Sequence, residues 1–124
     1  MSGVELDRAL RSGATHGESS LPAFGKLLAA TESGGSMTVS FDTTGVAASV
    51  IGVFTCSGEG AGPEVSVTRG GKSLLWFRSE GCDATNLYSG RSQPIGGGGG
   101  EATLRVTAPK GLIWSVVLEQ VVEG

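Results

Sequence analysis

Long hydrophobic runs are missing from this sequence. No apolar stretch approaches the roughly 18 residues that a membrane-spanning helix needs, so we expect no membrane span. The first residues, MSGVELDRALRSG, also lack the apolar centre of a signal peptide. This start leaves the compartment open, because Met1 is either a native start or was added to a mature secreted domain.

Histidine is scarce as well. His16 is the single histidine and lies in the loop-like stretch GATHGESS, so neither a fixed Ser-His-Asp triad nor a zinc site is expected. The net charge is only −3 and no stripe of Lys or Arg appears, which argues against nucleic acid as a partner. The run GGGGG does not lead into a helix with Lys-Ser/Thr, so it does not indicate a phosphate loop. We expect no catalytic residue and no cofactor.

Acidic residues offer weak alternatives. A glycosidase needs two carboxylates that flank one bond. The carboxylates available for such a pair follow or precede turns, where acidic side chains are normally solvated: Asp42, Glu59, Glu64, Glu80 and Asp83. Glu80, Asp83 and Asn86 lie close in sequence but supply few of the roughly six to eight oxygens that calcium prefers. A weak calcium site there remains an open alternative.

Glycine, by contrast, is abundant, with 22 of the 124 residues against a usual share of roughly 7%. Glycine weakens helices and supplies turn conformations, so we expect many turns and few long helices. The segment Ser36–Phe41 alternates strictly between polar and apolar residues, which is typical of a half-buried strand. RGGK lies between two strand-like runs and predicts a two-residue hairpin.

Strand-like segments recur at a spacing of roughly 10–12 residues, which is typical of sandwiches and jelly rolls. They cover residues 21–33, 36–41, 48–56, 63–68, 73–77, 86–89, 101–109 and 112–122. We therefore predict one all-β domain over residues 21–124, an antiparallel two-sheet β-sandwich of jelly-roll type with about eight strands. Residues 1–20 are expected to form a flexible N-terminal segment. The alternative is that Val4–Leu10 packs as a short helix on the sheet edge.

The two cysteines lie at the ends of one strand–turn–hairpin unit. Cys56 ends a strand and Cys82 follows the next hairpin, so such a unit can bring the two thiols together. A bridge closing a loop of this length contributes about 3–4 kcal/mol in the chain-entropy model. Two reduced, buried thiols in a cytosolic protein are the alternative.

Three motifs carry a resemblance to a family: CSGEG at 56–60, EGC at 80–82 and APKGLIWSVVL at 108–118. In these motifs the chain resembles small secreted or lipoprotein-type β-sandwich domains of actinobacteria, over roughly residues 36–120. Those domains are mostly uncharacterised. The resemblance implies an extracellular or cell-surface location and a disulfide, but no activity.

Aromatic residues give the candidate binding site. Trp114 and Trp76 lie in strand-like runs, where core packing is the default, although Trp76 could also serve a ligand platform. Tyr88 lies in the irregular stretch after Cys82 and is the best exposed candidate, with Arg91 and Gln93 as polar neighbours.

These residues predict a non-catalytic extracytoplasmic module that acts in binding or assembly with a partner protein or a glycan. A small secreted enzyme, or an enzyme inhibitor that uses surface loops, is the alternative. The ligand and the oligomeric state are left open.

Overall fold

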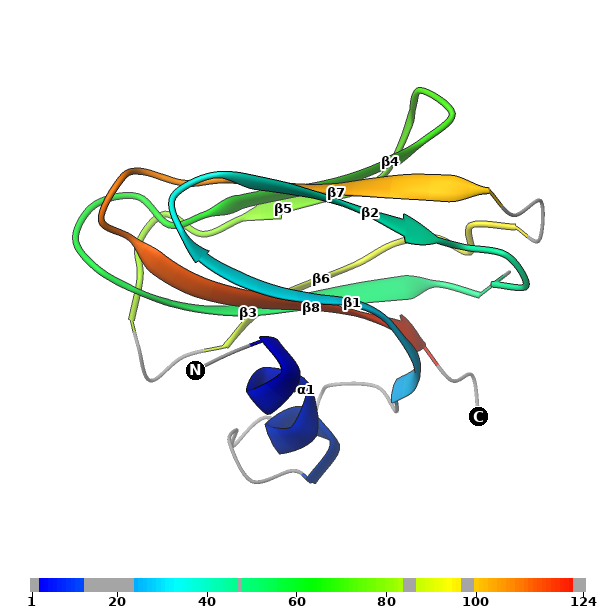
Figure 1. Cartoon of the computed structure of the whole chain (residues 1–124), viewed down its shortest axis with the longest axis horizontal. Coiled ribbons are helices and arrows are strands. Elements are labelled where there is room, and N and C mark those ends of the chain that lie inside the picture. The colour runs from blue at the N-terminus through cyan, green and yellow to red at the C-terminus, as the bar shows by residue number, and fades with distance from the viewer. Residues whose placement is uncertain (1–2, 13–23, 47, 84–86, 97–99, 122–124) are drawn as a thin grey trace.

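The computed structural model describes residues 3–12, 24–46, 48–83, 87–96 and 100–121. Helix α1 spans Gly3–Ser12. The strands are β1 Phe24–Gly34, β2 Met37–Asp42, β3 Val50–Ser57, β4 Glu64–Arg69, β5 Lys72–Arg78, β6 Tyr88–Arg91, β7 Glu101–Thr107 and β8 Ile113–Val121. They form two four-stranded sheets of order β1-β8-β3-β6 and β2-β7-β4-β5, paired antiparallel throughout and stacked as two layers (Figure 1). The predicted two-sheet antiparallel sandwich is confirmed.

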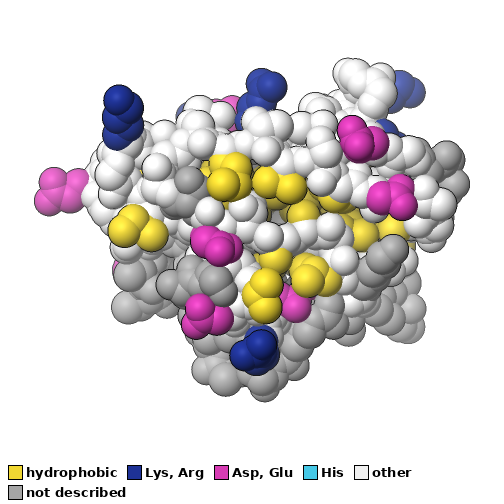
Figure 2. Space-filling view, in the orientation of Figure 1, with side chains coloured by type: hydrophobic (Ala, Val, Ile, Leu, Met, Phe, Trp, Pro, Cys, Tyr) yellow, Lys and Arg dark blue, Asp and Glu magenta, His cyan; other side chains and the backbone are white. Residues whose placement is uncertain are grey.

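The core lies between the two sheets and follows from the alternation along the strands. In β7, Ala102, Leu104 and Val106 are buried, while the residues between them point to the outside. The opposite sheet contributes Trp114 among its inward side chains, and the indole Nε1 donates to the Gly35 carbonyl oxygen at 2.6 Å. This hydrogen bond allows a fully buried tryptophan, because its one polar group is satisfied. In the view of Figure 2, hydrophobic side chains gather in a band between the two layers.

The outer face of the β1-β8-β3-β6 sheet also carries a cluster of buried apolar side chains, and helix α1 packs on it (Figure 1). Leu6 of the helix is fully buried against Ile51, Val53 and Val117. The helix comes so close to β1 that a Cβ on Gly3 would lie 2.4 Å from the Thr31 nitrogen. Where loop composition predicts a flexible segment, the structure therefore has a helix, and it covers a sheet face rather than an edge.

Residues 13–20 of the segment that we expected to be flexible lie outside the described residues. Among the described residues, no helix is long and apolar enough to cross a membrane.

At the β5–β6 side of the sandwich, a ring lies over two glycines. Gly52 and Gly90 are cross-strand partners, and a Cβ on Gly90 would meet the Phe77 ring at 2.6 Å. The glycine pair therefore makes room for Phe77 between the sheets. Phe54 stacks with Phe77 at 5.5 Å and with Tyr88 at 5.1 Å between ring centroids, which closes this side with aromatic rings.

Two covalent and turn features match the sequence predictions. Cys56 and Cys82 form a disulfide with Cα atoms 5.5 Å apart. The β4–β5 hairpin turns at Gly70 and Gly71, both with positive φ, as a two-glycine turn requires. Arg69 beside this turn donates to the Thr43 hydroxyl and to the Ile95 carbonyl, which ties the hairpin to two neighbouring loops. The short strand expected near residues 86–89 is β6, Tyr88–Arg91.

Candidate functional site

The outer face of the β2-β7-β4-β5 sheet is polar and open. In the part of the chain that the structure describes, no element covers it, whereas the opposite sheet carries α1 (Figure 1). Because the strands alternate, the residues opposite the core all lie on this one face, and each is exposed or half-buried. They are Thr38, Ser40, Asp42, Glu64, Ser66, Thr68, Trp76, Arg78, Glu101, Thr103, Arg105 and Thr107.

Trp76 is the one large aromatic residue on this face, and 54% of its surface is exposed. From the sequence, we expected the Trp76 side chain to pack in the core by default, and that expectation is wrong. Leu75 and Phe77 on either side point inward, so the alternation of β5 turns Trp76 outward. In cross-strand register it adjoins Ser66, which in turn adjoins Arg105. The indole thus stands at the edge of a surface made of hydroxyl groups and charges.

Arg78 lies two residues further along β5, on the same side as Trp76. Its Cζ atom is 5.9 Å from the Trp76 ring centroid, which is a cation–π contact. Such a contact between exposed side chains contributes about 0.5–1 kcal/mol.

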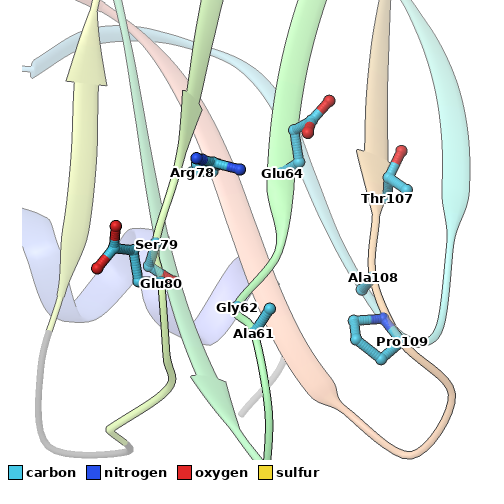
Figure 3. Close-up of a pocket in the computed structure, with 9 residues that line it drawn as sticks. All are labelled: Ala61, Gly62, Glu64, Arg78, Ser79, Glu80, Thr107, Ala108 and Pro109. Atoms are coloured by element: carbon cyan, nitrogen blue, oxygen red, sulfur yellow. The ribbon is translucent and has the colours of Figure 1, made fainter.

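A pocket of about 490 Å³ adjoins this pair at one end of the sheet (Figure 3). Its lining comes from β4, β5 and β7 and from the loops that follow β3, β5 and β7. The lining residues are Ala61, Gly62, Glu64, Arg78, Ser79, Glu80, Thr107, Ala108 and Pro109. Known small-molecule pockets span about 300–1,000 Å³, so this pocket is large enough for a small polar ligand.

The floor of the pocket is held by several contacts. The Ser79 nitrogen donates to the Pro63 carbonyl at 3.4 Å, and the Ser79 hydroxyl donates to the Gly81 carbonyl at 2.8 Å. Gly62 packs so closely here that a Cβ would lie 1.8 Å from the Ser79 hydroxyl oxygen. The disulfide begins at Cys82, one residue beyond. The segment from Ser79 to Cys82 is therefore braced against the loop before β4.

The charges in the pocket alternate in sign. Glu64 is the register partner of both Arg78 and Thr107, so the three side chains form one row across the sheet. Figure 3 shows the Arg78 guanidinium reaching toward β4, with Glu80 on the far side of Arg78 from Glu64. The two carboxylates point away from each other in this view. They are not arranged to flank a single bond, as the carboxylate pair of a glycosidase would be.

The structure does not bring the sequence-predicted binding residues together. Tyr88 was expected to be exposed, but it is half-buried, it stacks on Phe54, and its hydroxyl accepts a hydrogen bond from the Asp83 nitrogen at 3.1 Å. Arg91 pairs in register with Ile51 and so lies on the outer face of the other sheet, opposite Trp76. Gln93 is exposed after β6. Binding through these three residues stays a prediction.

Sequence reasoning missed Glu64, Arg105 and Thr107 as candidates for a shared ligand surface. The signal was available in part, because EATLRVT alternates and thereby places Arg105 and Thr107 on one side of β7. That β7 lies beside β4 could not be read from the pattern, since the two strands are far apart in sequence.

The structure gives no support to a calcium site at Glu80, Asp83 and Asn86. Asn86 lies outside the described residues. Among the residues that are described, no group of three His, Cys, Asp or Glu could hold a metal ion.

The comparisons with known proteins give distant likeness only. No family model matches the chain, and neither does any curated protein. Among solved structures, the chain is similar to the module TmCBM61 in complex with β-1,4-galactotriose. The match has 15% identity and a TM-score of 0.44, and it covers 77% of this chain and 68% of the other. A likeness at this level does not carry a ligand from one chain to the other.

Proposed function

We propose that this chain is a glycan-binding module that holds a sugar ring on Trp76. The observation that carries the proposal is a tryptophan more than half exposed on an open sheet face whose other outward side chains are hydroxyl-bearing or charged. A sugar ring has an apolar C–H face and a rim of hydroxyl groups. The indole offers an apolar plane for the first, and Ser66, Arg78 and Arg105 offer hydrogen-bonding groups for the second.

The composition of the face favours a polar ligand over a protein partner. The buried centre of a protein–protein interface is enriched in aromatic side chains, methionine and arginine and depleted of serine, lysine and acidic residues. Binding energy there comes from a few clustered anchors. Here a single aromatic residue stands among serine, threonine and charged side chains, which suits a ligand with many hydroxyl groups.

We propose binding without turnover. Glu64 and Glu80 lie on opposite sides of Arg78 and point apart, so they offer no general acid facing a nucleophile across one bond (Figure 3). Hydrolysis of a bound oligosaccharide by the purified protein would favour the enzyme alternative instead.

We also propose that the protein works outside the cytoplasm. The disulfide between Cys56 and Cys82 supports this location, because disulfides persist in oxidising compartments and are rare in the cytosol.

Trp76→Ala tests the proposal. Wild-type protein is first screened against immobilised and soluble polysaccharides, and Kd is then measured by calorimetry for those that bind. Removing the stacking plane should weaken binding at least tenfold, about 1.4 kcal/mol, while the melting temperature stays within about a degree because the side chain is exposed.

The matched control is Ile113→Ala. Ile113 is another exposed apolar side chain, 61% exposed, on the sheet that does not contain Trp76. It should bind like wild type. Unchanged affinity in Trp76→Ala, or no glycan bound by wild type, would contradict the proposed function.

A further inference from the structure

The pocket begins beside Trp76, further along strand β5. Its nearest wall is Arg78, two residues along the same strand and on the same face. Two strand residues span about 7 Å, so the pocket lies within reach of a chain that has one ring on Trp76. A chain with one ring on Trp76 and its axis along β5 therefore places the neighbouring unit in the pocket. Resting on the proposed function, we infer that the pocket binds this second unit and that the unit is uncharged.

The charges of the pocket select against an anionic sugar. Arg78 would attract a carboxylate or sulfate, but Glu64 and Glu80 line the same pocket. Like charges near a protein surface repel, so each of the two carboxylates weakens the binding of an anionic group in the pocket. An acidic unit thus faces two repulsive partners for one attractive partner.

The same side chains suit a neutral polyol. A carboxylate accepts from several hydroxyl groups, a guanidinium only donates, and a threonine hydroxyl does both. Glu64 lies between Arg78 and Thr107 in register, so donors and acceptors alternate across one row of the sheet. Neighbouring hydroxyl groups on a sugar ring are themselves donors and acceptors, and they can pair with such a row without any net charge.

Glu64 is therefore the residue that sets specificity in the pocket. It sits in β4, hydrogen-bonded between β5 and β7, so its backbone is held on both sides. A carboxylate that accepts hydrogen bonds from two hydroxyl groups forms charge-assisted bonds, which are roughly twice as strong as neutral ones.

The experiment compares Glu64→Gln with Glu101→Gln. Glu101 is exposed at the opposite end of the same sheet, so its variant removes the same charge without touching the pocket. The ligands are mono-, di- and trisaccharides of the neutral glycan identified in the screen, and an oligogalacturonide series as the anionic probe. Kd is measured at low and at moderate salt, and melting temperatures check that both variants are folded.

Four results support the inference. Affinity should rise at least tenfold from the monosaccharide to the disaccharide, because the second unit gains the pocket. Glu64→Gln should remove most of that gain while leaving the monosaccharide Kd within about twofold. Glu101→Gln should match wild type. The oligogalacturonides should bind at least tenfold more weakly than the neutral series, and Glu64→Gln should narrow this difference.

Other results overturn it. Equal affinity for mono- and disaccharide, or an unchanged disaccharide Kd in Glu64→Gln, would mean that the second unit does not occupy the pocket. Preference for the oligogalacturonides would refute an uncharged unit. In each of these cases a loss of binding in Trp76→Ala would still uphold the proposed function, so the two failures can be told apart. Absence of all glycan binding refutes both.

Discussion

Replacing Gly90 with alanine sets two opposite effects on stability against each other. Gly90 does not have a positive φ, so its backbone conformation is open to alanine. On that ground alone, Gly→Ala would stabilise the protein by about 0.4–1 kcal/mol, because it restricts the unfolded chain. The packing effect destabilises the protein, since the new Cβ would lie 2.6 Å from Cγ, 2.7 Å from Cδ1 and 2.9 Å from Cβ of Phe77.

The packing effect should win. All three contacts are with the rigid root of Phe77 rather than with the end of a flexible side chain, so the ring must move as a body. Its displacement also disturbs the stack with Phe54. Overpacking of this kind costs about 1–3 kcal/mol, and subtracting the backbone gain leaves a net loss centred near roughly 1.3 kcal/mol, with an upper limit of about 2.6 kcal/mol. For a domain of this size that lowers the melting temperature by roughly 4–8 °C.

Thermal and denaturant unfolding, followed by circular dichroism, measure this loss. Gly34→Ala is the matched control, because Gly34 is also a strand glycine without positive φ, and its Cβ would meet only one atom, at 3.9 Å. It should be neutral or slightly stabilising. Adding Phe77→Ala should make Gly90→Ala less costly in a double-mutant cycle, since alanine lacks the Cγ and Cδ1 atoms that make the two shortest contacts. A Gly90→Ala protein that melts at or above wild type would refute the placement of Phe77 over the glycine pair.

Two further predictions concern the brace of the pocket and the helix. Reducing the Cys56–Cys82 bridge should cost about 3–4 kcal/mol and should also weaken disaccharide binding, because the bridge holds the segment that carries Ser79 and Glu80. Unfolding and calorimetry with and without reductant check this, and an unchanged melting temperature would contradict it. Leu6→Ala should lower the unfolding free energy by about 2–4 kcal/mol, because Leu6 is fully buried on the sheet. Val4→Ala is its control, since Val4 is 54% exposed, and a loss below about 0.5 kcal/mol for Leu6→Ala would contradict the packing of α1 on the sheet.

The strand count and the layer architecture were predictable from the sequence, because they depend on local pattern. The alternation of polar and apolar residues in Ser36–Phe41 and in EATLRVT predicts which side chains face the core, even when the other strands of that core are not known. The glycine pair in RGGK predicts a turn, because the turn needs positive φ angles that glycine adopts easily. The two cysteines flank a single strand–turn–hairpin unit, so their bridge was predicted from that unit, with two reduced thiols as the alternative.

The candidate site depended on tertiary structure, and the reason is visible in SLLWF. Leu74, Leu75, Trp76 and Phe77 are all apolar, so alternation cannot tell which of them faces inward. Which of these side chains face inward is set by the register of β5 with β4 and by the space that Gly52 and Gly90 of the other sheet leave for Phe77. Once Phe77 occupies that room, Trp76 must point outward.

Tyr88 and the N-terminal helix show the same division. Tyr88 is half-buried because its ring stacks on Phe54, which lies 34 residues before it in the sequence. The local sequence pattern around Tyr88 does not predict such a distant partner. Helix α1 is too short to be stable alone in water and depends on the apolar outer face of β3 and β8. Composition and periodicity thus determined the elements and their turns. Which side chains stand on the open face was decided only when distant strands came together, because burial depends on the neighbours that folding supplies.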